Sequence, residues 1–218
     1  VRRIEKMGLC DSIYCEIPGA QTARITVPRD TVTLSKMSYG YSVEMTPMQI
    51  LMFYNAIANN GRMIRPYLVS RIEQEGRTIT TFSTETVRSS ICKSSTLRDI
   101  RLALHDVVWD NHLGTAAVNP WGMRKAQSER VHIAGKTGTA QLFQQGKYWG
   151  TRHRMTFVGY FPEEEPRYTC ICMIEYPKTY GYDAGMDCGS VVRQIAEKTI
   201  AYTGCYTIQG DSLVLNKR

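Results

Sequence analysis

The sequence predicts an α+β fold in which helices pack against an antiparallel sheet. Two segments with apolar residues at helical spacing precede a series of strand-like segments, and a third such helical segment follows the series. Short turns separate the strand-like segments, which is typical of an antiparallel meander. Helices that precede and follow such a sheet cover it in an α+β domain.

The first expected helix runs from about Pro47 to Asn59. Thr46 is a favourable N-cap, and proline suits the first helical position. Asn60 and Gly61 then allow the helix to close in the left-handed conformation. Apolar residues recur at helical spacing along this segment: Ile50, Leu51, Tyr54, Ile57 and Ala58.

Two more helices are expected. Ser94 or Ser95 caps one that ends near Asp110, and the other runs from about Ser190 to Tyr202. Residues 1–36 are expected to be largely irregular. The expected apolar face of the helix before Asp110 consists of Leu97, Ile100, Leu104, Val107 and Val108.

Five strands are expected from runs of β-forming residues. A hairpin pairs 67–72 with 78–82 and turns at Glu75 and Gly76. The other three strands cover 131–143, 155–160 and 168–176. Because short turns join these three, we expect a sequential antiparallel sheet.

Composition excludes several classes of protein. The 218 residues are 43% hydrophobic and 22% charged, as in an ordinary globular protein, and the net charge of +7 is scattered along the chain. No basic run alternates with aromatic residues, so we expect no nucleic-acid partner. No apolar run reaches the ~18 residues of a membrane span. The first residues, Val-Arg-Arg, suggest a fragment or a processed product.

Cysteines and histidines give no metal-site pattern. The seven cysteines fit neither a zinc site nor a CxxC redox pair, although Cys10 and Cys15 could pair. His105 and His112 have no cysteine or carboxylate at ligand spacing and are expected to be surface or packing residues. The sequence therefore predicts no metal and no cofactor.

The most informative stretch is Ile133 to Gln141, which reads IAGKTGTAQ. Thr137 and Thr139 would share one face of a strand, and Lys136 would point to the other face or along the strand's rim. Gly138 would let another molecule approach the backbone. One cation and two hydroxyls beside an open backbone suit the capture of a carboxylate on an extended peptide.

Three stretches together resemble the C-terminal part of a class B penicillin-binding protein, a bacterial D,D-transpeptidase that cross-links peptidoglycan. The first runs from Tyr39-Gly40 through Thr46-Pro47 to Asn60-Gly61. The second combines Val107-Val108 with Gly114-Thr115-Ala116, and the third is Lys136-Thr137-Gly138-Thr139 with Phe157 to Pro162 after it. The segment with Tyr176-Pro177 and Tyr180-Gly181 favours the septal, cell-division branch over the elongation branch.

The resemblance implies a role for each residue of the third stretch. Lys136 would be a catalytic residue that supplies positive potential and a hydrogen bond to the serine of a Ser-x-Asn motif. Thr137 and Thr139 would bind the carboxylate of a D-Ala-D-Ala terminus or of a β-lactam, and the Thr139 N–H would donate to the oxyanion. Gly138 would let the acyl donor lie against the strand.

Two motifs of the family are missing from these residues. No Ser-x-Asn occurs, and the one Ser-x-x-Lys before Lys136, at Ser90 and Lys93, follows the Tyr-Gly and Thr-Pro stretch, whereas the family's nucleophile precedes it. We therefore expect residues 1–218 to be the C-terminal portion of a single transpeptidase domain. The part that holds the nucleophile would lie outside them, and the chain alone would be inactive.

The resemblance also implies partners and a location. The full-length protein would act on peptidoglycan stem peptides, bind β-lactams and contact cell-division proteins. It would face the periplasm from the cell inner membrane, through an anchor upstream of residue 1. Two alternatives remain, namely a β-lactam sensor domain and a non-catalytic interaction module.

Overall fold

The computed structural model describes residues 2–9, 11, 16, 25, 28, 30–41, 43–144, 147–178, 183–204, 206–209 and 212–215. The chain divides into two compact units, residues 1–97 and 98–218, each with its own set of contacts. Cys10 and Cys15, which could pair on sequence grounds, lie outside the described residues.

The first unit begins with two short helices, α1 (Arg2–Lys6) and α2 (Thr31–Met37). Residues 1–36 were expected to be largely irregular, so α2 was not predicted. Asp30 caps α2, because its carboxylate accepts a 2.8 Å hydrogen bond from the Thr33 N–H. That hydrogen bond also lowers the pKa of Asp30.

Helix α3 (Pro47–Ala58) confirms the expected helix and its start. Thr46 and Gln49 form a capping box, in which each side chain accepts a hydrogen bond from the other's backbone N–H. Asn60 and Gly61 both have positive φ, as the expected left-handed ending requires. The predicted apolar face was partly wrong, since Ile50, Leu51 and Tyr54 are only half-buried. The buried positions are Gln49, Met52, Ala56, Ile57 and Ala58.

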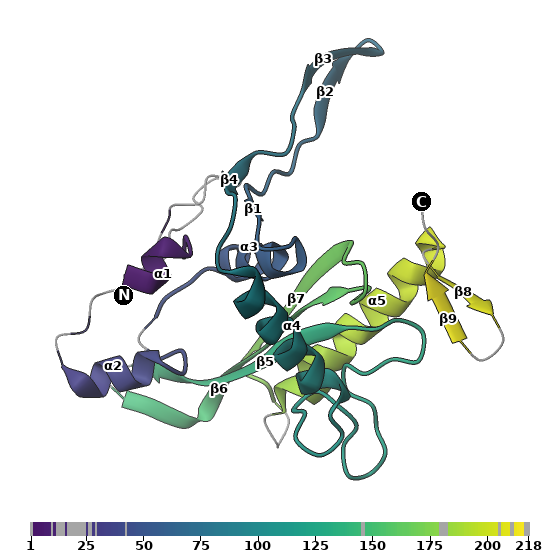
Figure 1. Cartoon of the computed structure of the whole chain (residues 1–218). Helices are drawn as coiled ribbons and strands as arrows, with labels where there is room; N and C mark the ends of the chain where they lie inside the picture. Colours follow the sequence, from purple (N-terminus) through teal and green to yellow (C-terminus); the bar gives the residue numbers. More distant parts are fainter. Residues whose placement is uncertain are drawn as a thin grey trace. The chain divides into compact units, whose positions relative to one another are not determined.

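Two antiparallel strand pairs complete this unit. β1 (Met63–Ile64) pairs with β4 (Thr86–Arg88), and β2 (Arg71–Gln74) pairs with β3 (Arg77–Thr81). The second pair is the expected hairpin, but its first strand was placed wrongly at 67–72, because the strand begins only at Arg71. Glu75 and Gly76 have φ of 50° and 76°, so both turn residues are left-handed. Figure 1 shows this hairpin extending away from the β1–β4 pair.

Helix α4 (Ser94–Trp109) links the two units and confirms the second expected helix. Leu97, Leu104 and Val108 are buried, as their spacing predicted. Ile100 was wrongly assigned to the buried face, because 42% of its surface is exposed.

The second unit contains the predicted antiparallel meander. β5 (Ala134–Gln144), β6 (Lys147–Phe161) and β7 (Tyr168–Glu175) form a sheet in the order β5-β6-β7. β6 is much longer than the six residues expected, because it pairs with β5 as far as Lys147.

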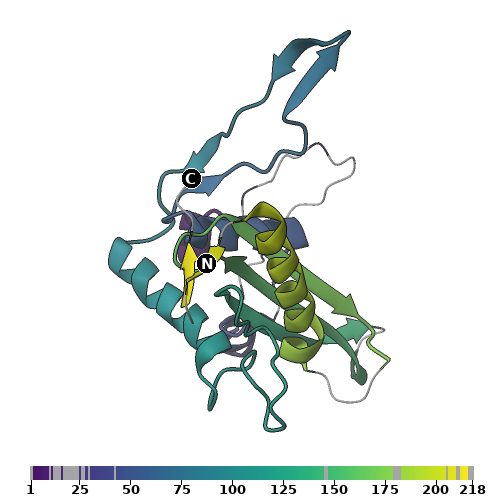
Figure 2. The ribbon, with the colours of Figure 1, turned by 90° about the vertical axis from the view of Figure 1, so that its right-hand side faces the viewer.

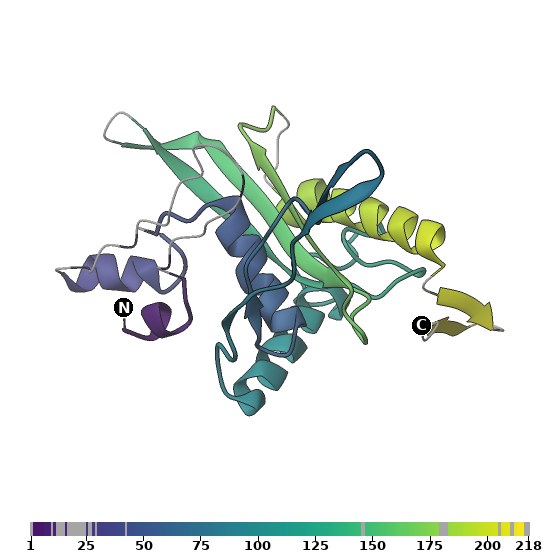
Figure 3. The ribbon, with the colours of Figure 1, turned by 90° about the horizontal axis from the view of Figure 1, so that it is seen from above.

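The core of the second unit lies between this sheet and helix α5 (Ser190–Thr203). A π-helical turn, η1 (Gly185–Gly189), leads directly into α5, which lies across one face of the sheet (Figures 2 and 3). Val192 and Ala196 of α5 are fully buried against Met155 and Phe157 of β6. A hairpin of β8 (Tyr206–Gln209) and β9 (Ser212–Leu215), which was not predicted, follows α5.

None of the described helices is long and apolar enough to cross a membrane. The predicted α+β class is confirmed, with helices packed against an antiparallel sheet.

Candidate functional site

Residues Lys136 to Thr139 lie on β5 at the point where this strand leaves the core. Ala134 and Gly135 are buried, whereas Lys136, Gly138 and Thr139 are exposed. The polar group thus begins immediately after the residues that anchor the strand.

Two glycines fix this part of β5 against β6. Gly135 and Gly159 are partners in the register, and the ring of Phe157 packs against them. A Cβ on Gly135 would lie 2.6 Å from both the Phe157 ring and the Val158 carbonyl oxygen, so no larger residue fits there. A Cβ on Gly138 would meet nothing closer than 3.8 Å. The backbone at Gly138 is therefore open, as the sequence suggested.

Lys136 extends along the rim of the strand toward the next residue. Its Nζ donates a 2.8 Å hydrogen bond to the Thr137 carbonyl oxygen and lies 3.5 Å from Thr137 Oγ1. This is the rim orientation that the sequence allowed. Partial desolvation lowers the pKa of Lys136 below the usual lysine value.

Thr137 also contacts Thr115, from the loop that follows α4. The two hydroxyl oxygens are 2.6 Å apart. If Lys136 and Thr115 both donate to Thr137 Oγ1, the Thr137 hydroxyl hydrogen is free to donate to an incoming anion. Ammonium and hydroxyl donors gathered at one position suit a carboxylate. Thr115 belongs to the second of the three stretches that carry the family resemblance, but its contact with Thr137 was not predicted.

The edge of β5 next to these side chains has no strand partner within the described sheet, whose order is β5-β6-β7. An edge strand can pair through its main chain with an extended peptide. The arrangement can therefore hold a peptide along the strand and its carboxylate near Thr137.

In the part of the chain that the structure describes, no cluster of three or more His, Cys, Asp or Glu side chains could hold a metal ion. His105 Nδ1 lies 2.9 Å from Glu163 Oε1 and its ring stacks on Trp109, so it is a packing residue as expected. His112 is exposed, and its backbone N–H donates to Asp110.

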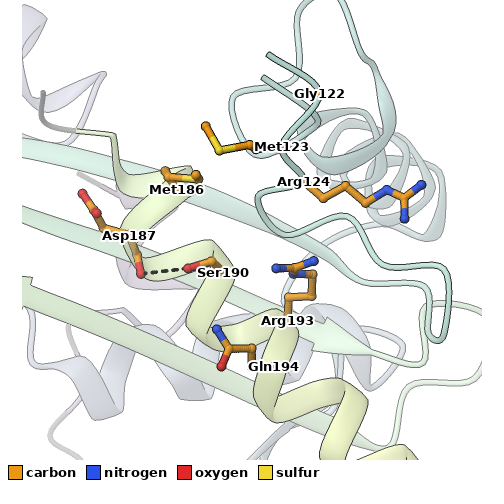
Figure 4. A pocket seen from close by; sticks show the side chains of 8 residues that line it. All are labelled: Gly122, Met123, Arg124, Met186, Asp187, Ser190, Arg193 and Gln194. Carbon is orange, nitrogen blue, oxygen red and sulfur yellow. Dashed lines mark hydrogen bonds between the residues drawn. The ribbon is translucent and has the colours of Figure 1, made fainter. Parts of the chain in front are cut away.

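A separate pocket of about 700 Å³ lies between the loop at Gly122 and the start of α5 (Figure 4). Met123 and Met186 line one side, and Arg124 and Arg193 contribute positive charge. Its remaining lining residues are Gly122, Asp187, Ser190 and Gln194. None of the residues from Lys136 to Thr139 lines it, so this pocket is distinct from the β5 group.

Comparison with known proteins shows the family to which this chain belongs. A family model described as the penicillin binding protein transpeptidase domain matches residues 4–197. The chain belongs to the penicillin-binding protein transpeptidase domain family. This confirms the class B penicillin-binding protein resemblance, whereas the septal branch stays a prediction. Tyr180 and Gly181, on which that branch partly depends, lie outside the described residues.

Relatives of known name are distant and longer. The probable peptidoglycan D,D-transpeptidase PenA of Neisseria gonorrhoeae is 26% identical over 160 residues, which is 73% of this chain and 24% of the relative. Stage V sporulation protein D of Bacillus subtilis is 28% identical over 142 residues, 65% of this chain and 20% of the relative. The chain thus spans no more than about a quarter of these relatives.

Solved structures of penicillin-binding proteins share the fold. Penicillin-binding protein 2X from Streptococcus thermophilus superposes with a TM-score of 0.80 at 20% identity, over 93% of this chain and 30% of that one. Penicillin-binding protein 3 from Mycobacterium tuberculosis, complexed with aztreonam, gives a TM-score of 0.76 at 22% identity, over 100% of this chain and 48% of that one.

The structure also bears on the Ser-x-x-Lys match at Ser90. In this family the serine and lysine act together, which requires their side chains to meet. Ser90 lies before α4, outside any helix, and its hydroxyl donates a 2.6 Å hydrogen bond to the Cys92 carbonyl oxygen. This geometry agrees with the view that Ser90 is a chance match to the motif.

Proposed function

We propose that residues 1–218 form the C-terminal portion of a single peptidoglycan D,D-transpeptidase domain, acting through an acyl-serine intermediate. The observation that carries this proposal is the group of Lys136, Thr137 and Thr115 beside the open backbone at Gly138. The names of the relatives, which include peptidoglycan D,D-transpeptidases, support it.

Each residue from Lys136 to Thr139 has a role in the proposal. Lys136 is the catalytic cation of this wall of the site. Thr137 and Thr139 bind the terminal carboxylate of a D-Ala-D-Ala stem peptide, or of a β-lactam that mimics it. Gly138 lets the acyl donor lie along β5, and the Thr139 N–H donates to the oxyanion.

The remaining parts of the site would come from polypeptide outside residues 1–218. We place the serine nucleophile and the Ser-x-Asn motif there, because neither is found before Lys136 in a suitable form. The full-length protein would act in septal cell-wall synthesis with other cell-division proteins. It would work on the periplasmic side of the inner membrane, held by an anchor outside these residues.

Labelling with a fluorescent penicillin tests the proposal. The full-length protein should form a stable covalent adduct, and Thr137→Val should slow acylation by about tenfold because one carboxylate hydrogen bond is lost. Thr80→Val, a change of the same kind on the exposed strand β3, should have no effect. The polypeptide 1–218 alone should give no adduct.

The outcomes separate the alternatives. A full-length protein that no penicillin labels would refute the proposal and favour an interaction module. A protein that is labelled but forms no cross-linked peptide product, even with added stem-peptide donor and acceptor, would be a β-lactam sensor instead.

A further inference from the structure

Lys125 is an unusually buried lysine close to the Thr115 loop. Only 14% of its side chain is exposed. Its Nζ donates a 3.1 Å hydrogen bond to the Thr115 carbonyl oxygen and forms a 2.7 Å ion pair with Asp183 Oδ2. Removing an ammonium group from water is costly unless its donors are satisfied, so both contacts are needed to hold it there.

The partner carboxylate is itself fixed at the beginning of η1. Asp183 Oδ1 accepts a 3.0 Å hydrogen bond from the Met186 N–H. Lys125 therefore joins two segments that are far apart in sequence, the loop at Thr115 and the start of η1. Its ammonium group has a defined position because both of its partners are ordered by backbone contacts.

The Thr115 backbone is confined on a second side by Gly185. A Cβ at Gly185 would lie only 2.2 Å from the Thr115 carbonyl oxygen and 3.0 Å from Lys125 Cδ. The neighbouring Ala116 N–H donates a 2.9 Å hydrogen bond to the Val107 carbonyl oxygen. The carbonyl that Lys125 binds thus sits in close packing, and the Thr115 side chain projects from a fixed backbone.

We propose that Lys125 is a positioning residue for the carboxylate-binding group on β5. By holding the Thr115 carbonyl, it keeps the Thr115 hydroxyl within 2.6 Å of Thr137 Oγ1. Thr115 then donates to Thr137, and the Thr137 hydroxyl hydrogen is directed to the substrate carboxylate. Lys125 touches no substrate itself. This inference rests on the proposed transpeptidase function.

The test compares two probes on the full-length protein: benzylpenicillin, which carries the carboxylate, and its methyl ester, which lacks the charge. Lys125→Met should lower the second-order rate of acylation by benzylpenicillin about tenfold and that by the ester by less than about twofold. Lys125→Arg, which retains a charged donor, should recover most of the rate. Lys198→Met removes an exposed lysine of α5 and should leave both rates unchanged.

Two further variants keep the test decisive if Lys125→Met folds poorly. Asp183, whose side chain is 42% exposed, can be changed to Asn, and this variant should show the same selective loss with benzylpenicillin. Combining Lys125→Met with Thr137→Val should cost little more than Thr137→Val alone, because both changes act on one hydroxyl.

Three results would each overturn the positioning role of Lys125. Equal slowing with both probes, additive effects with Thr137→Val, or a wild-type rate in Lys125→Met would each show that Lys125 is a structural lysine only. If wild-type protein is not acylated at all, the transpeptidase function fails first and the role of Lys125 falls with it.

Discussion

Gly135 and Gly138 lie three residues apart on the same strand, but their substitution by alanine should change different properties. Gly135→Ala should lower the stability of the fold, and Gly138→Ala should lower the rate of acylation. A Cβ on Gly135 would approach the Phe157 ring and the Val158 carbonyl to 2.6 Å and Gly159 Cα to 3.0 Å. Phe157 is fully buried, and the other two contacts are backbone atoms of β6, so none of them can move away easily. Overpacking of this kind costs about 2–3 kcal/mol.

That cost is large enough to measure directly. For a chain of this size, about 2–3 kcal/mol corresponds to a fall in Tm of about 5–10 °C. The Gly138→Ala variant should melt within about 1 °C of wild type, since its nearest neighbour is 3.8 Å away. The same variant should nevertheless acylate more slowly, because the added methyl group occupies the place of the acyl donor.

Scanning calorimetry and penicillin labelling, both on the full-length protein, provide the assay. Gly135→Ala should lower Tm, and Gly138→Ala should lower only the acylation rate. If Gly135→Ala melts like wild type, the close approach of β5 and β6 has been misjudged. If Gly138→Ala acylates like wild type, the donor does not lie against this strand.

Three other predictions concern stability and reactivity. A hydrogen bond to Glu164 raises the pKa of His132, so this pair stabilises the fold below the usual histidine pKa and loses that contribution as pH rises through the raised pKa. Tm should therefore fall as pH rises above about 6.5, and His132→Gln should remove that fall. Burial raises the pKa of Cys188 to about 12, so iodoacetamide at pH 8 should modify Cys92 well before Cys188. Peptide mass spectrometry would measure the two rates of modification, and equal rates would contradict the burial of Cys188. Thr46→Ala removes the capping box of α3 and should cost about 1 kcal/mol in urea unfolding, whereas Thr46→Ser should cost little.

Local chemistry explains which parts of the fold could be foreseen. The start of α3 was predictable because Thr46 and Pro47 act within one helical turn, and the β2–β3 turn because Glu75 and Gly76 tolerate positive φ. Helix α2 was missed because it has seven residues and no buried face, although its Asp30 cap was present in the sequence. The π-helical turn at η1 has no sequence signal of its own, since it depends on how the chain enters α5.

The candidate site also has features that the sequence predicts and features that depend on tertiary packing. The proximity of Lys136 to Thr137 follows from their being neighbours on a strand rim, and the openness at Gly138 follows from its missing side chain. The contact between Thr115 and Thr137 spans 22 residues. The ion pair of Lys125 with Asp183 spans 58 positions in the chain, and neither residue belongs to a recognisable motif. Contacts of this kind depend on tertiary packing, which the sequence does not display.

The order of burial along β5 indicates how the site keeps its shape. The strand is fully buried at Ala134 and held by glycine packing at Gly135, and its residues from Lys136 to Leu142 are exposed or half-buried. The core on the N-terminal side of Lys136 and the pairing of β5 with β6 therefore fix its backbone, and its ammonium group donates to the Thr137 carbonyl oxygen. On the other flank, Thr137 is placed by Thr115, whose backbone the buried Lys125 holds. The carboxylate site that we propose would have its donors in place before the ligand arrives, which would lower the entropic cost of binding.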